Sequence, residues 1–150
     1  MKVLIDSNVI LEVILQREEY ETANSVLRAL YESEHEMFMT TGCFYGMLYV
    51  VDKYLRKDMK LVNPKRTDTL RSVMAKVLSI MKVAGHDNDS LLRGINDGKF
   101  MDLEDSCQHQ AAVKAGCDYL ISFNLKDYAN GASIKAMTPR EFLDSMSEKE

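Results

Sequence analysis

The chain has 150 residues, of which 46% are hydrophobic and 28% are charged. This composition is typical of a single soluble domain over residues 1–150 with a substantial core. The formal net charge of −4 counts against non-specific coating of nucleic acid by the whole surface, although it permits a local basic face. The odd number of cysteines and an N-terminus without a signal-peptide or membrane-anchor pattern predict a cytoplasmic protein.

Buried strands and amphipathic helices alternate along the first half of the sequence. The segment KVLID is a continuous apolar run that ends at an acid, as is typical of a buried parallel strand. Further short apolar runs predict additional strands, and apolar residues spaced three or four apart predict helices. The expected strands are 2–6, 37–41 and 80–84, and the expected helices are 20–31, 44–55 and 65–79.

The second half continues this alternation and carries clear helix boundaries. Short helices are expected at 89–95 and 103–115, and strands at 119–123 and 134–137. Gly116 ends the helix before it, and TPREFL has the pattern of a capping box that opens a final helix. Together the elements predict an α/β fold with a mostly parallel central sheet of four to five strands and helices on both faces.

Acidic and amide side chains from distant parts of the sequence fall at one edge of this sheet. Asp6 ends the first strand, and Asn124 and Asp127 follow the strand at 119–123. The segment MDLEDSCQ places further acids at the start of the helix before that strand. Since parallel sheets bind ligands at the carboxyl ends of their strands, we expect these groups to converge on one site.

Asp6, Asp105 and Asp127 would together form an oxygen-rich site. Carboxylates held close together repel one another, and a divalent cation such as Mg²⁺ or Mn²⁺ removes that repulsion. Water bound to such a metal can attack phosphorus. Asp102 is a possible further ligand, but a helix N-terminus also favours acids, so Asp102 and Glu104 could serve only as capping or solvated residues.

Three quoted segments resemble one family in the same order along nearly the whole chain. MKVLIDSNVILEVIL resembles the opening of PIN domains, and specifically of VapC-like toxin ribonucleases. DLEDSCQHQAAVKAGCDYLISFNLKDY resembles their central acid–helix–strand–acid segment, and TPREFL resembles their closing turn and helix.

The resemblance implies a PIN-like three-layer sandwich with the activity of that family. That activity is endoribonuclease cleavage of single-stranded RNA with Mg²⁺ or Mn²⁺. It further implies the toxin of a type II toxin–antitoxin pair, with a cognate antitoxin and a homodimer formed through the first helices.

The resemblance also assigns roles residue by residue. Asp6 is the first acid, with Asn8 as the polar residue that supports its loop, and Asp105 is the third acid. Asn124 occupies the family's last acidic position, and a further common acid falls on Asp127.

Two positions depart from the family pattern. The second acid is expected early in the helix after the second strand, where this chain reads TGCFYGMLYV and has Gly46. Asn124 is a neutral ligand where many family members have Asp. Gly46 therefore favours an alternative, in which a catalytically degenerate PIN domain binds RNA or protein without cutting. A phosphoryl-transfer enzyme of the haloacid-dehalogenase type is a further alternative, but it needs a second acid where DSN supplies Asn8.

One basic segment is a candidate RNA-binding surface. A basic stretch with a nearby aromatic residue, here Tyr54, can hold a single-stranded phosphate backbone, although the same pattern is typical of a solvated helix surface. The candidate residues are Lys53, Arg56, Lys57, Lys60 and Arg66. His109 lies on the same helical face as Asp105 and is interpreted as a structural histidine, with substrate contact as the alternative.

Overall fold

The structure, a computed structural model, describes residues 1–148 and contains one five-stranded parallel sheet. The strands occur in the spatial order β3-β2-β1-β4-β5, and every neighbouring pair is parallel. Their bounds are β1 Lys2–Ile5, β2 Glu36–Thr40, β3 Lys82–Ala84, β4 Tyr119–Ile121 and β5 Lys135–Met137.

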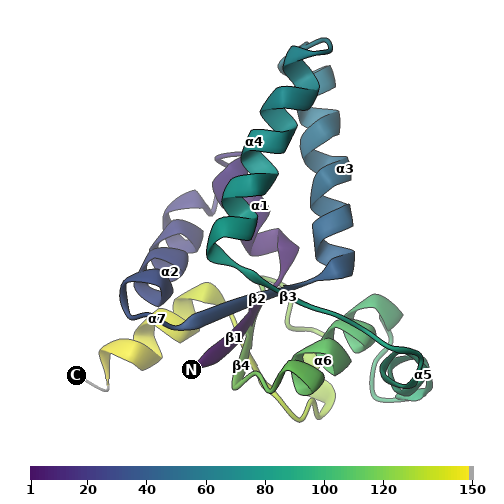
Figure 1. Ribbon diagram of the computed structural model, residues 1–150. Helices are drawn as coiled ribbons and strands as arrows, with labels where there is room; N and C mark the ends of the chain where they lie inside the picture. The colour runs from purple at the N-terminus through teal and green to yellow at the C-terminus, as the bar shows by residue number, and fades with distance from the viewer. Residues whose placement is uncertain (149–150) are drawn as a thin grey trace.

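Helices cover both faces of the sheet, as the ribbon diagram shows (Figure 1). On one face lie α1, α2, α3, α4 and α7, and on the other lie α5 and α6. The two longest helices, α3 and α4, form a projecting hairpin. The helices are α1 Ser7–Ile14, α2 Tyr20–Glu32, α3 Thr41–Lys57, α4 Lys65–Ile80, α5 Asn88–Asn96, α6 Leu103–Ala115 and α7 Pro139–Ser147, with a 3₁₀ turn at Tyr128–Asn130.

The expected α/β class and three-layer arrangement are therefore confirmed, together with nearly all expected elements. The helix at 103–115 has the expected bounds, and Gly116 ends it in the left-handed conformation with φ of 70°. Thr138 and Glu141 form the expected capping box at α7. The helix at 7–14 was not expected, because its apolar residues lie in a nearly continuous run without a clear polar face.

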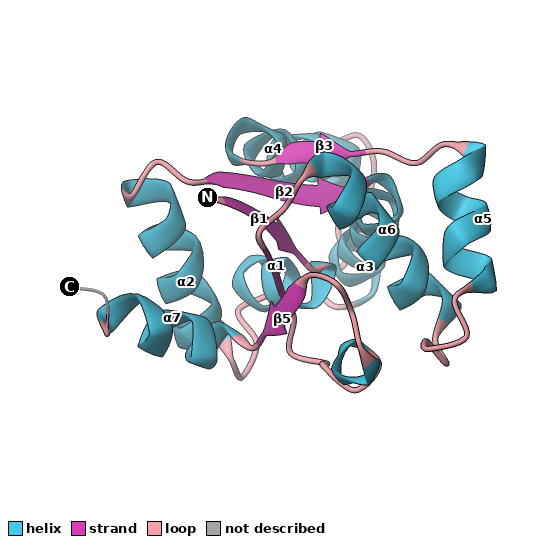
Figure 2. Ribbon diagram, turned by 90° about the horizontal axis from the view of Figure 1, so that it is seen from below, coloured by secondary structure: helices cyan, strands magenta, loops and turns pink. Residues whose placement is uncertain are grey.

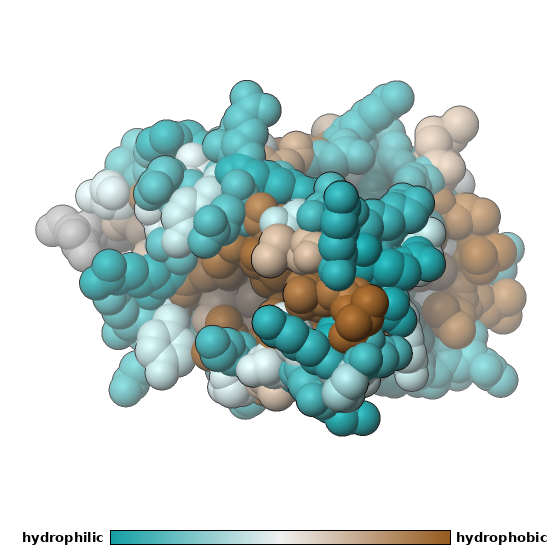
Figure 3. Space-filling model, turned by 90° about the horizontal axis from the view of Figure 1, so that it is seen from above, coloured by the Kyte–Doolittle hydropathy of each residue, from teal (hydrophilic) through white to brown (hydrophobic). Residues whose placement is uncertain are grey.

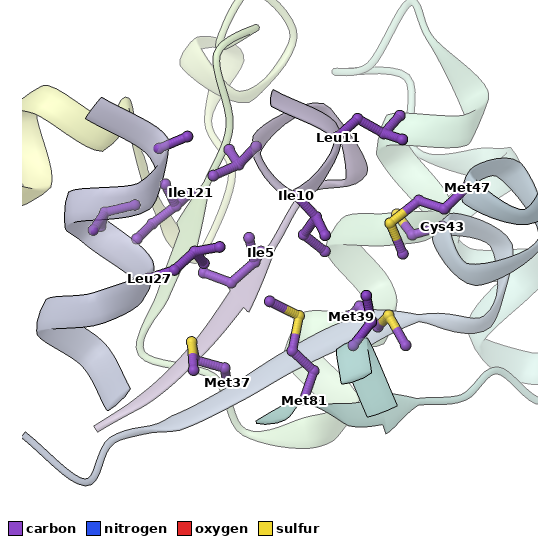
Figure 4. Close-up of a cluster of buried hydrophobic side chains, with 14 of the residues drawn as sticks. Ile5, Ile10, Leu11, Leu27, Met37, Met39, Cys43, Met47, Met81 and Ile121 are labelled. Atoms are coloured by element: carbon purple, nitrogen blue, oxygen red, sulfur yellow. The ribbon is translucent and has the colours of Figure 1, made fainter. Parts of the chain in front are cut away.

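The sheet separates two hydrophobic clusters because side chains alternate along a strand. Val3 and Ile5 of β1 point into the larger cluster, whereas Leu4 packs in the smaller one against α6. Figure 4 shows Ile5 and Ile121 with the sulfur-containing side chains of Met39 and other residues in the larger cluster. Flexible methionine side chains fill gaps in this core, and those in it are Met37, Met39, Met47, Met74, Met81 and Met137.

The strand order brings the carboxyl ends of β1 and β4 together at the reversal of the sheet. The chain leaves β1 toward β2 and β3 on one side, and returns to place β4 and β5 on the other (Figure 2). Parallel sheets of this topology bind ligands at such a point. No helix within residues 1–148 is long and apolar enough to cross a membrane.

Candidate metal centre

Asp6 sits where β1 ends and is fixed by the neighbouring strand. Its backbone N–H donates to the Ile121 carbonyl at 2.9 Å. Its carboxylate accepts hydrogen bonds from the hydroxyls of Ser122 at 2.8 Å and Ser7 at 3.3 Å. Ser122 is fully buried. The Asp6 carboxylate is therefore held at the reversal of the sheet rather than turned freely into solvent.

Asn8 ties the first turn of α1 to the segment after β4. Its side-chain amide donates to the Ser122 hydroxyl at 3.0 Å, and its side-chain oxygen accepts from the Phe123 backbone N–H at 3.2 Å. Sequence analysis did not single out Ser122, although it stands directly after β4. A small polar residue at the carboxyl end of a buried strand is the signal that could have identified it.

Asp102 and Asp127 join the start of α6 to the segment after β4. Asp102 caps α6, since its carboxylate accepts from the backbone N–H groups of Glu104 at 2.9 Å and Asp105 at 3.2 Å. Its own backbone N–H donates to the carboxylate of Asp127 at 2.6 Å. Asp127 is buried, with 6% of its surface exposed. The capping interpretation of Asp102 thus describes its geometry, and this geometry also positions Asp127.

Three carboxylates meet at this point. One oxygen from each of Asp102, Asp105 and Asp127 lies within 4.8 Å of the others. The pKa of Asp105 is raised to about 6, first by burial and then by the charges of Asp102, Asp6 and Asp127, whereas a hydrogen bond from Tyr128 opposes the rise. Asp6, at the end of β1, is thus near enough for its charge to raise the pKa of Asp105. The sheet therefore brings the three acids predicted as metal ligands into one electrostatic cluster.

The donor set fits a small divalent cation. Carboxylate oxygens are the ligands that Mg²⁺ and Mn²⁺ prefer. Within residues 1–148, the lysine and arginine side chains that form ion pairs do so with acids other than Asp6, Asp102, Asp105 and Asp127. The negative charge of the cluster is thus balanced by no ion pair of the described chain, and a bound cation would relieve the repulsion that raises the pKa of Asp105.

A buried polar chain lies beneath the acids. The Cys43 thiol donates to the Gln108 side-chain oxygen at 2.8 Å, and the Gln108 amide donates to the Tyr128 hydroxyl at 2.9 Å. All three residues are buried. Because the Tyr128 oxygen accepts from Gln108, its proton is free to point to Asp105, its other hydrogen-bonding partner. These contacts join residues 20 and 65 positions apart, so no local sequence pattern indicates them.

The two positions that depart from the family pattern are both near this edge. The Asn124 side-chain oxygen accepts from the Lys126 backbone N–H at 3.3 Å, which stabilises the turn after β4. Gly46 is exposed in the second turn of α3, and a Cβ added there would have no atom within 4 Å. Neither packing nor backbone conformation therefore requires glycine at this position.

The predicted basic residues lie on the last turns of α3, in the segment that follows and at the start of α4. Lys53, Arg56 and Lys57 lie on the last turns of α3, and all three are exposed. Lys60 lies in the turn that follows, and Arg66 is partly buried on α4 beside Asp52, at 3.1 Å.

His109 has the structural position that was preferred for it. It is 4% exposed, and its Nε2 accepts from the backbone N–H of Ser133 at 3.1 Å.

Apolar side chains also reach the surface away from the acids. Seen from above, brown residues gather at the end of the α3–α4 hairpin and over α5 (Figure 3). The exposed apolar residues of these elements include Met59 and Val62 of the hairpin and Leu92 and Ile95 of α5. A separate groove of about 390 Å³ lies between α1, α2 and α4. Its lining is apolar except for Lys76, and consists of Ile10, Val13, Ile14, Leu27, Val73, Lys76, Val77, Ile80 and Met81.

Comparison with known proteins agrees with this architecture. The sequence model of the PIN domain matches residues 2–126. A curated relative, ribonuclease VapC1 of Aquifex aeolicus (strain VF5), is 24% identical over 146 residues, which cover 95% of this chain and 94% of the relative.

Solved structures share the fold at low sequence identity. The crystal structure of FitAcB from Neisseria gonorrhoeae matches with a TM-score of 0.66 and 15% identity, and the match covers 92% of this chain and 98% of the matched chain. VapBC2 of Rickettsia felis, bound to a fragment of promoter DNA, matches with a TM-score of 0.64 and 13% identity over 92% and 98% of the two chains. VapC20 of Mycobacterium tuberculosis, a toxin that cleaves the sarcin–ricin loop, matches with a TM-score of 0.58 and 10% identity over 87% and 95%.

Proposed function

Because the chain belongs to the PIN domain family, we propose that it is a metal-dependent endoribonuclease that cleaves single-stranded RNA. The observation that carries this proposal is the cluster of Asp102, Asp105 and Asp127, with Asp6 close enough to raise the pKa of Asp105. The similarity to a ribonuclease along almost the whole chain supports it.

Mg²⁺ or Mn²⁺ would be held by Asp6, Asp105 and Asp127, with Asp102 as a further oxygen donor. A cation held there would supply a polarised water and electrostatic stabilisation of a phosphate group. The chain's own contribution is to fix the carboxylates. Ser122 orients Asp6, and the Asp102 backbone N–H orients Asp127.

Two amide side chains support this site. Asn8 holds the Phe123 backbone and thereby the start of the segment that carries Asn124 and Asp127. Asn124 lies beside that backbone and offers a neutral oxygen, so its proposed role is to orient the water or complete the metal shell. Asn8 is a positioning residue, because its contacts are to the protein.

Cleavage of RNA tests the proposal directly. The wild-type chain is incubated with an unstructured, end-labelled single-stranded RNA with Mn²⁺, with Mg²⁺ and with a chelator. We expect cleavage with either metal, none with the chelator, and loss of cleavage in Asp6→Asn. Asp118→Asn is a matched control, since Asp118 lies before β4 at the opposite end of the sheet. Absence of cleavage in the wild type, or equal cleavage by Asp6→Asn, would refute the enzyme.

A second candidate function is an RNA- or protein-binding module without catalysis. The absence of a carboxylate at Gly46 favours it, because one expected metal ligand is missing. In that case the wild type binds RNA without cutting it, and a carboxylate at position 46 restores cleavage. Since an added Cβ at Gly46 meets no atom within 4 Å, Gly46→Glu tests this alternative without an expected steric penalty.

The proposal includes a cognate antitoxin as protein partner, in the cytoplasm, where the three free cysteines stay reduced. The apolar groove between α1, α2 and α4 would accept an apolar segment of that partner. Val73→Glu should abolish binding of a purified antitoxin, encoded beside this chain, while RNA cleavage persists. Unchanged binding would place the partner elsewhere. A homodimer is also proposed. A molar mass of one chain, measured by light scattering, would exclude it.

A further inference from the structure

One exposed face of α3 leads away from the acidic cluster. Gly42, Gly46, Tyr49 and Lys53 recur every three or four residues, so they share one face of the helix, and all are exposed. The two glycines leave this face bare nearest to the acids, since a Cβ at Gly42 would meet only the Thr40 hydroxyl, at 3.8 Å. Tyr49 and Lys53 follow one and two turns beyond Gly46.

This face leads into a hollow. A surface hollow of about 380 Å³ lies between the last turns of α3 and the segment that joins α1 to α2. Arg17 contributes from that joining segment, and Tyr49, Lys53, Tyr54 and Asp58 contribute from α3 and its end. It therefore combines two aromatic rings with two cations.

The position of the hollow relative to the acids follows from the helix geometry. Cys43, on the first turn of α3, lies near Asp6, since the pKa of its thiol is raised by burial and also by the charge of Asp6. From Cys43 to Lys53 the helix rises by about 15 Å. A single strand of a few nucleotides spans this distance, and Gly46 lies between the two ends without a side chain to obstruct it.

We propose that this hollow is a nucleotide subsite for the single-stranded RNA substrate, separated from the acidic cluster by the bare face of α3. The inference rests on the proposed ribonuclease function. A base stacks on the exposed ring of Tyr49, as bases do on aromatic side chains in single-strand-binding proteins. Arg17 and Lys53 contact the adjacent phosphates, and the Asp58 carboxylate accepts from base amino or ribose hydroxyl groups.

The two cations of the hollow, Arg17 and Lys53, are accessible to a bound phosphate. Arg17 and Lys53 are exposed and form no ion pair among those of residues 1–148, whereas Arg66 is paired with Asp52. Both cations of the hollow can therefore release counterions on contact with phosphate. Tyr49 is 66% exposed, which leaves its ring available to a base.

RNA affinity tests this inference separately from cleavage. Asp6→Asn serves as the background, so that bound RNA stays intact. Fluorescence anisotropy measures binding of a labelled, unstructured hexaribonucleotide in Mg²⁺ at several salt concentrations. Adding Arg17→Ala with Lys53→Ala should weaken binding about tenfold and flatten its salt dependence. The matched control, Lys135→Ala with Arg140→Ala, removes one exposed lysine and one exposed arginine elsewhere and should change affinity less than twofold.

Stacking is tested on the same background. Tyr49→Leu should weaken binding about tenfold, and Tyr49→Phe should retain it because the ring is kept. A hexamer with 4-thiouridine should cross-link to residues 46–58 on irradiation. Equal losses in the charge variant and its control, or an unchanged affinity of Tyr49→Leu, would overturn the subsite. Either result leaves the ribonuclease proposal standing if the wild type still cleaves RNA.

Discussion

The charged side chains differ between the amino edge of the sheet, where its parallel strands begin, and the carboxyl edge, where they end. At the amino edge, the Lys2 backbone N–H donates to Asp118 at 2.8 Å, and Lys82 pairs with Glu36, whose pKa is lowered by that hydrogen bond. At the carboxyl edge, burial and neighbouring acids raise the pKa of Asp105 to about 6. Acids at the first edge are stabilised by partners in the chain itself, whereas the acids of the cluster at the second edge have no ion-pair partner among residues 1–148.

Removing a carboxylate should therefore have very different consequences at the two edges. Asp127→Asn should lower the rate of metal-dependent RNA cleavage by at least about 100-fold, because it removes one of the proposed metal ligands. Asp118→Asn should leave the rate within about twofold. Initial rates at saturating Mn²⁺ measure both. Comparable losses of cleavage rate in the two variants would mean that the carboxylates of the carboxyl edge have no particular role in cleavage.

Divalent cations should stabilise only through the carboxyl edge. At Mn²⁺ one hundred times above its Kd, binding to the folded state alone should raise the free energy of unfolding by about 2.7 kcal/mol. Thermal unfolding with increasing Mn²⁺ measures this in the wild type, in Asp105→Asn and in Asp118→Asn. We expect the stabilisation to vanish in Asp105→Asn and to persist in Asp118→Asn. The same shift in all three proteins would assign the metal to another place.

A carboxylate at position 46 should strengthen Mn²⁺ binding at the carboxyl edge. Gly46→Glu adds a carboxylate early in α3, where its side chain has room, and should tighten Mn²⁺ binding about tenfold, or ~1.4 kcal/mol. Gly46→Gln is the matched control, because it has nearly the same shape and helix propensity without the charge. Calorimetric titration measures both affinities. Equal affinities in Glu and Gln variants would show that position 46 does not reach the metal.

The metal-free protein should become more stable when the carboxylate of Asp105 is replaced by a neutral amide. Asp105 has a folded-state pKa near 6, above its ordinary value near 4. Between these values the folded state binds more protons than the unfolded state, so this group adds stability as pH falls and costs stability as pH rises. Allowing for solvent screening, Asp105→Asn should stabilise the protein at pH 7.5 by about 1 kcal/mol.

Urea unfolding at pH 7.5 and pH 5 measures this difference in the presence of a chelator. The advantage of Asp105→Asn over the wild type should shrink as pH falls through 6, because the wild-type carboxyl then becomes neutral. The comparison between the two proteins cancels the opposing contribution of His109, whose pKa is lowered by burial. A wild type that is the more stable protein at pH 7.5 would contradict the account.

Local signals in the sequence were sufficient for most of the fold. The capping box of α7 and the left-handed Gly116 lie where their residue types indicate, because these effects act over a few residues. The helix at 7–14 was missed because its apolar run resembles a continuation of β1. The carboxyl edge was predictable since parallel strands place their ends together.

The finer structure of the candidate site depends on contacts that no local pattern encodes. Ser122 contacts both Asp6 and Asn8, each more than 100 positions away from it in the sequence. Arg17 lies in a short connection without periodicity, so its place beside Tyr49 emerges only from the packing of α1 against α3. Asp102 was left between capping and metal binding, and its position satisfies the first while leaving its carboxylate within the cluster.

The most direct measurement of the central claim is Mn²⁺ binding followed by electron paramagnetic resonance, which reports free Mn²⁺. The account predicts that the wild type and Asp118→Asn take up Mn²⁺ with the same affinity, and that Asp105→Asn and Asp127→Asn lose this binding at the same concentrations. Uptake that survives both carboxyl-edge substitutions, or that is absent from the wild type at millimolar Mn²⁺, would contradict it.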